Sequence, residues 1–81
     1  MFYHYRDQSK KEIDLIIETK SGQLIAVETK VAATVGASDF KVLREFQHAH
    51  ADKFSIGVVI YEGEHLLPFG EGMFAVPASY I

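Results

Sequence analysis

Two segments with apolar side chains on both faces, residues 24–31 and residues 54–61, constrain the fold of this chain most strongly. A strand of this kind is typical of a central position in a sheet that is covered on both sides. Between them, residues 38–50 carry apolar side chains such as Phe40 and Leu43 at helical spacing. Two strands joined by one helix are candidates for a parallel pair with a right-handed crossover. The sequence therefore predicts an α/β domain.

The N-terminal part of the chain predicts two further strands. Residues 2–6 form a short aromatic segment, and residues 12–19 alternate between apolar and polar side chains. Strict alternation places three apolar side chains of the second strand on one face: Ile13, Leu15 and Ile17. Gly22 marks a hairpin turn, which makes this strand the neighbour of residues 24–31.

The remaining segments predict a helix cap and two short strands. Ser38 is placed to cap the helix, because its hydroxyl can accept from free backbone N–H groups. Residues 66–69 and 73–76 have the length of short strands. Pro68 and Pro77 assign them to sheet edges, because proline donates no backbone hydrogen bond. We expect a mixed sheet built from three strands, a helix, a strand and these edge strands.

A single helix covers only one face of such a sheet. The other face requires cover from a preceding segment that is absent from this chain or from a second copy of the chain. We therefore expect a homodimer.

Size and composition narrow the class of protein. The 81 residues suffice for one domain, residues 1–81. No apolar run is long enough to cross a bilayer, which indicates no membrane association of that kind. The formal charge of -3 disfavours strong autonomous binding of nucleic acid. The chain contains no cysteine, which excludes disulfides and thiolate chemistry and makes a cytoplasmic location the default expectation.

Three charged residues on the predicted hairpin point to chemistry. Asp14 and Glu28 lie at similar distances from the turn, so their carboxylates are expected to face each other. Two such carboxylates repel unless a cation lies between them, and Mg²⁺ prefers oxygen ligands. This arrangement suits hydrolysis of phosphodiester bonds. Lys30, two residues after Glu28, would stabilise the charge that develops on the phosphorane or orient the attacking water. The pattern predicts a Mg²⁺ site, with Mn²⁺ as a substitute, in which Asp14, Glu28 and Lys30 are catalytic.

A structural interpretation of the same residues remains open. Glu28 and Lys30 also fit a solvated pair at the end of a strand, or an ion pair with Asp14 that fixes the strand register. A surface pair of this kind contributes roughly 0–1 kcal/mol.

The segments E-I-D-L-I-I-E and A-V-E-T-K resemble the D…ExK signature of the PD-(D/E)XK nuclease superfamily. Nearly the whole chain resembles the C-terminal domain of bacterial and archaeal AAA+ ATPases known as domain of unknown function 4143. The resemblance implies a restriction-endonuclease-like fold, with metal-binding acids at Asp14 and Glu28 and the lysine at Lys30. It also implies that a helix and an ATPase domain precede this segment in related proteins. We therefore expect a domain that lacks its leading helix.

Two functions from different classes follow. The first is Mg²⁺-dependent hydrolysis of phosphodiester bonds in DNA. The second is a non-catalytic interaction, dimerisation or regulatory module of an AAA+ ATPase, in which the charged residues form a structural network and the apolar face binds a partner.

Overall fold

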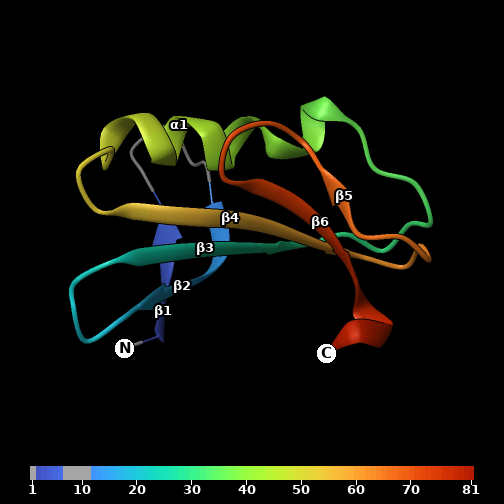
Figure 1. Ribbon diagram of the computed structural model, residues 1–81, viewed down its shortest axis with the longest axis horizontal. Helices are drawn as coiled ribbons and strands as arrows, with labels where there is room; N and C mark the ends of the chain where they lie inside the picture. Colours follow the sequence, from blue (N-terminus) through green and yellow to red (C-terminus); the bar gives the residue numbers. More distant parts are fainter. Residues whose placement is uncertain (1, 7–11) are drawn as a thin grey trace.

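The computed structural model describes residues 2–6 and 12–81, which form a mixed six-stranded sheet with one α-helix packed on it (Figure 1). The strand order is β1-β2-β3-β4-β6-β5. The strands are β1 (Phe2–Arg6), β2 (Glu12–Glu18), β3 (Leu24–Thr29), β4 (Phe54–Tyr61), β5 (Leu67–Pro68) and β6 (Met73–Pro77). The helices are η1 (Ala37–Phe40), α1 (Lys41–Ala49) and η2 (Ala78–Tyr80), of which η1 and η2 are 3-10 turns. The predicted α/β class is confirmed.

The strand pairs follow from the connections between them. β2 and β3 form an antiparallel hairpin, in which Gly22 adopts a φ of 87°, a backbone conformation that favours glycine. β3 and β4, separated in sequence by α1, pair in parallel. The parallel pair predicted from the two apolar segments is therefore confirmed.

The prediction that both short C-terminal strands lie at sheet edges is wrong for β6. β6 lies between β4 and β5 and pairs in parallel with β4. Pro77 is the last residue of β6, so its missing N–H interrupts only the end of the ladder. Pro68 lies in β5, which is the edge strand, as predicted.

A β-bulge in β2 corrects the prediction that Ile13, Leu15 and Ile17 share one face. Ile13 pairs with Tyr5 and Ile16 pairs with Tyr3, so β2 has one residue more than β1 between these pairs. The extra residue reverses the alternation. Ile13 therefore joins Ile16 in the core, where both are fully buried, while Leu15 and Ile17 are partly exposed.

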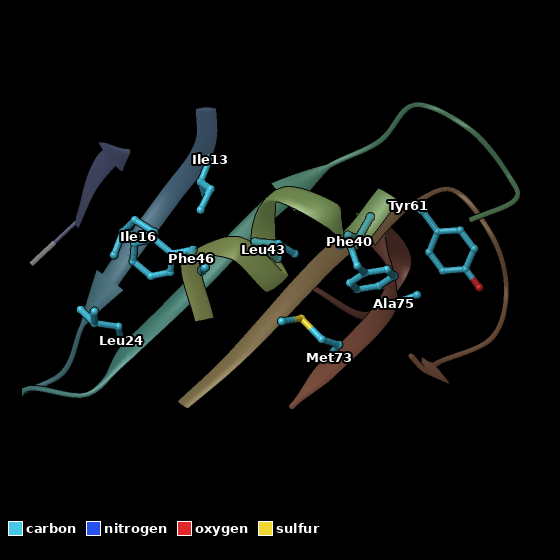
Figure 2. Close-up of a cluster of buried hydrophobic side chains, with 11 residues drawn as sticks. Ile13, Ile16, Leu24, Phe40, Leu43, Phe46, Tyr61, Met73 and Ala75 are labelled. Carbon is cyan, nitrogen blue, oxygen red and sulfur yellow. The ribbon is translucent and has the colours of Figure 1, made fainter. Parts of the chain in front are cut away.

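The core lies between α1 and one face of the sheet. Phe40, Leu43 and Phe46 project from η1 and α1 into a cluster with strand residues such as Ile16 and Met73 (Figure 2). Helical spacing thus predicted the buried side of α1 correctly. The cap at Ser38 is wrong, because η1 begins at Ala37 with Gly36 as its capping residue.

The opposite face of the sheet is apolar and only partly covered. We call it the open face and define it by nine partly exposed residues: Leu15, Ile17, Ile25, Val27, Ile56, Val58, Ile60, Phe74 and Val76. In the described part of the chain both α1 and η1 lie on the other side of the sheet (Figure 1). Among the described residues, none of the helices is long and apolar enough to span a bilayer.

Candidate functional site

Asp14 lies at the β-bulge of β2, beside the end of β3. Its Oδ2 atom accepts two hydrogen bonds from Thr29, one from the backbone N–H at 2.9 Å and one from the hydroxyl at 2.9 Å. The paired ladder between β2 and β3 ends at Leu15 and Val27, and beyond it the Asp14 carboxylate accepts the backbone N–H of Thr29. Asp14 is exposed, so this network lies at the protein surface.

Glu28 approaches Asp14 from the neighbouring strand. Its Oε1 atom accepts a hydrogen bond from the backbone N–H of Asp14 at 3.1 Å. The structure therefore places Asp14 and Glu28 side by side at the end of the hairpin, with the Glu28 carboxylate bonded to the Asp14 backbone. Side chains bond to backbone N–H groups of the neighbouring strand in both directions. The Glu28 carboxylate accepts from Asp14, and the Asp14 carboxylate accepts from Thr29.

Lys30 turns to a different acid. Its Nζ atom lies 2.6 Å from Oδ2 of Asp39, which precedes α1 in η1. The same carboxylate oxygen accepts from the backbone N–H of Gly36 at 2.8 Å. The hydrogen bond from Gly36, followed by the one from Lys30, lowers the pKa of Asp39 below its ordinary value. Lys30 therefore ties the end of β3 to the segment that leads into the helix.

Asp39 is the residue of this network that sequence reasoning missed. The overlooked signal was its spacing from Gly36, because a carboxylate three residues after a capping residue can reach back to the capping N–H.

Metal binding at this network would depend on two carboxylates. Among the described residues, no group of three or more His, Cys, Asp or Glu side chains is placed to hold a metal ion. Mg²⁺ is commonly held by one or two protein carboxylates together with water and substrate phosphates. Asp14 and Glu28 would therefore supply a number of carboxylates that this ion commonly uses.

The surface hollows of the molecule lie elsewhere. One of about 540 Å³ is bordered by Val35, Tyr61, Glu64 and His65. Another of about 460 Å³ is bordered by Arg44, Gln47, His48, Phe54 and Glu71. Neither is lined by Asp14, Glu28 or Lys30. Asp14 is exposed and Glu28 and Lys30 are partly exposed, so the predicted catalytic residues lie at the surface outside these two hollows.

Comparison with known proteins gives one match. The family model described as a domain of unknown function (DUF4143) matches residues 1–81 of the chain. No curated protein and no solved structure matches the chain significantly.

Proposed function

We propose that this chain, which belongs to the DUF4143 family, is a protein-interaction module that uses the open face of its sheet to bind a partner. In this proposal the residues of the D…ExK pattern hold the fold together. This is the second of the two functions expected from the sequence.

The open face is the observation that carries the proposal. Two rows of paired residues cross this face: Leu15–Val27–Val58–Phe74 spans four strands, and Ile17–Ile25–Ile56 spans three. Parallel strands such as β3, β4 and β6 usually occur in sheets covered on both faces. A contiguous apolar patch that is left exposed marks an interaction surface in a soluble protein. Binding a partner here would remove these side chains from water.

The charged network supports the same function, because its members are satisfied within the chain. Asp14 bonds to Thr29, Glu28 bonds to Asp14, and Lys30 bonds to Asp39. Such bonds stabilise the end of the hairpin and its connection to α1 without requiring a metal ion or a substrate. A net contribution of about 1 kcal/mol is typical for each hydrogen bond.

The finer fold assignment and the protein context are also part of this proposal. Along the chain, three strands are followed by a helix and then by β4, which pairs in parallel with β3. This order supports a restriction-endonuclease-like arrangement and a relationship to the PD-(D/E)XK superfamily. A place beside an AAA+ ATPase domain in longer relatives would suit a module that binds or regulates a partner.

A photoreactive side chain tests the proposal without knowledge of the partner. We would introduce it at Val58, on the open face, and at His48, which is exposed on α1 on the opposite side of the sheet. Irradiation of cells that produce the protein should give covalent protein adducts, including adducts of the chain with itself, from position 58 and few from position 48. Equal yields from the two positions, or none from position 58, would contradict the proposal.

One observation favours a second candidate function, Mg²⁺-dependent hydrolysis of phosphodiester bonds in DNA. Asp14 and Glu28 converge from β2 and β3, with Oε1 of Glu28 3.1 Å from the Asp14 nitrogen. These two carboxylates would hold the ion, which when bound polarises a phosphoryl oxygen and lowers the pKa of water. Lys30 would have to leave Asp39 before its ammonium group could bind a phosphate.

Calorimetric titration with Mn²⁺ separates the two candidates. The interaction proposal predicts no saturable binding and no cleavage of linear, nicked or branched DNA. Asp14→Asn removes one carboxylate charge of the site, and Asp52→Asn removes an equal charge from an exposed turn after α1. Saturable binding that is lost only in Asp14→Asn, together with DNA cleavage that Lys30→Ala abolishes, would establish the nuclease instead.

A further inference from the structure

The open face raises the question of which protein covers it. The answer deepens the interaction function proposed above and rests on it. We propose that a second copy of this chain occupies the open face, in a two-fold symmetric dimer in which the two sheets pack face to face.

The charge distribution favours a second copy. A two-fold interface places the same surface on both sides, so any charged group near the axis meets a like charge. The nine residues of the open face include no ionisable side chain. The outer side of α1 carries Lys41, Arg44, Glu45 and His48, and the chain has a formal charge of -3. Two copies can therefore meet across these nine residues without like charges in contact, while the Asp14 carboxylate, bonded to Thr29 beside Ile60, borders the patch.

The size of the face is compatible with a small dimer interface. The four strands that carry it, spaced by about 4.8 Å and about 17–26 Å long, give a flat area on the order of 300–500 Å². A stable interface buries roughly 600–1,000 Å² on each partner. Because side chains make the accessible surface larger than its flat projection, the open face approaches the lower end of this range.

The C-terminal residues add exposed apolar side chains after β6. η2 lies on the side of the sheet away from α1 (Figure 1). Tyr80, its last residue, and Ile81, which follows it, have exposed fractions of 60% and 80%. Facing sheets pack about 10 Å apart through interdigitated side chains, for which the β-branched residues of the open face are well suited.

Light scattering coupled to size exclusion tests the proposal on the 81-residue chain. At micromolar concentration we expect twice the mass of the 9.1 kDa chain. Val58→Asp places a carboxylate at the centre of the open face and should halve the observed mass. Ala49→Asp adds the same charge on the exposed side of α1 and should leave the dimer intact. A monomeric wild-type chain, or a Val58→Asp variant that folds and stays dimeric, would overturn the proposal.

A disulfide experiment answers the same question if Val58→Asp does not fold. The chain has no cysteine, so Val58→Cys and Ala49→Cys each introduce a single thiol. Mild oxidation should produce covalent dimers from Val58→Cys and not from Ala49→Cys, and the reverse result would overturn the proposal. A monomeric chain whose position 58 still crosslinks to another protein rejects the second copy and keeps the interaction function. A monomeric chain without any adduct from position 58 rejects both.

Discussion

The two faces of the sheet are built from the same strands and differ in what covers them. One row of paired residues lies under α1 and is buried: Ile16, Ala26, Gly57 and Met73. The adjacent row lies on the open face and is partly exposed: Leu15, Val27, Val58 and Phe74. Both rows are apolar, so hydrophobic residues line both faces of the sheet. Hydrophobicity therefore predicts that both faces are covered in the working protein, while in the described part of the chain α1 and η1 lie on only one of them.

The largest expected effect comes from the helix side of this comparison. Leu43 projects from α1 and is fully buried against the sheet. Leu43→Ala removes its packing and leaves a cavity, so the free energy of unfolding should fall by about 2–5 kcal/mol. Urea denaturation followed by circular dichroism measures the change. A loss below 1 kcal/mol would show that α1 is not firmly packed on the sheet.

Two neighbouring valines allow a direct comparison of the faces. Val59 is 1% exposed on the covered face, and Val58 is partly exposed on the open face. In dilute solution, Val59→Ala should lower the free energy of unfolding by about 2 kcal/mol and Val58→Ala by less than about 1 kcal/mol.

The difference between the two valines should depend on protein concentration. When association couples to folding, the stability of the folded chain rises with concentration. The loss caused by Val58→Ala should therefore grow as the urea titration is repeated at higher protein concentration, while the loss caused by Val59→Ala should stay constant. If the losses caused by Val58→Ala and Val59→Ala changed with protein concentration in the same way, the distinction between the two faces would be wrong.

The ion pair of Lys30 and Asp39, which ties β3 to η1, should make a smaller and pH-dependent contribution to the free energy of unfolding. Because the folded-state pKa of Asp39 is lowered, its contribution is fully present above the unfolded value near 3.8 and is lost as the pH falls through the folded value. Asp39→Asn should destabilise the protein by about 1 kcal/mol at pH 7. Urea denaturation between pH 7 and pH 2.5 should show this difference shrinking below about pH 4. A difference that increases toward low pH would contradict the assignment.

The smallest expected effect concerns the bond between Thr29 and Asp14 at the end of the hairpin. Thr29→Val keeps the shape of the side chain and removes the hydroxyl that donates to Asp14 at 2.9 Å. Because the bond is exposed and the backbone N–H of Thr29 still binds Asp14, we expect a loss of about 0.5 kcal/mol. Thermal unfolding measures it, with Ser55→Ala on β4 as an exposed control. A loss above about 2 kcal/mol would mean that this network supports more of the fold than its exposure suggests.

The sequence predicted the parts of the fold that depend on local pattern. The hairpin at Gly22, the parallel pairing of β3 with β4 and the buried side of α1 follow from turn chemistry and hydrophobic spacing. The bulge that moves Ile13 into the core depends on how β2 pairs with β1, which no alternation within one strand reveals. The central position of β6 was missed because Pro77 suggested an edge, although a proline at the last residue of a strand costs little pairing.

For the candidate site, the sequence predicted which acids lie near each other but not which group Lys30 contacts. Asp14 and Glu28 meet because hairpin register brings them together, and register follows from the position of the turn. The partner of Lys30 was not predictable, because Asp39 lies nine residues away in a segment whose path depends on the packing of η1 and α1. Short-range spacing therefore located the acids but not the contacts of the lysine.

Intermolecular NMR contacts test the central claim of this account most directly. A sample that mixes isotope-labelled and unlabelled chains reports only contacts between different copies when the spectrum is filtered for them. We predict such contacts for the side chains of Val27, Val58 and Phe74 on the open face, and none for Leu43 in the core under α1. An absence of intermolecular contacts at the open face at millimolar concentration, or contacts confined to the outer side of α1, would contradict it.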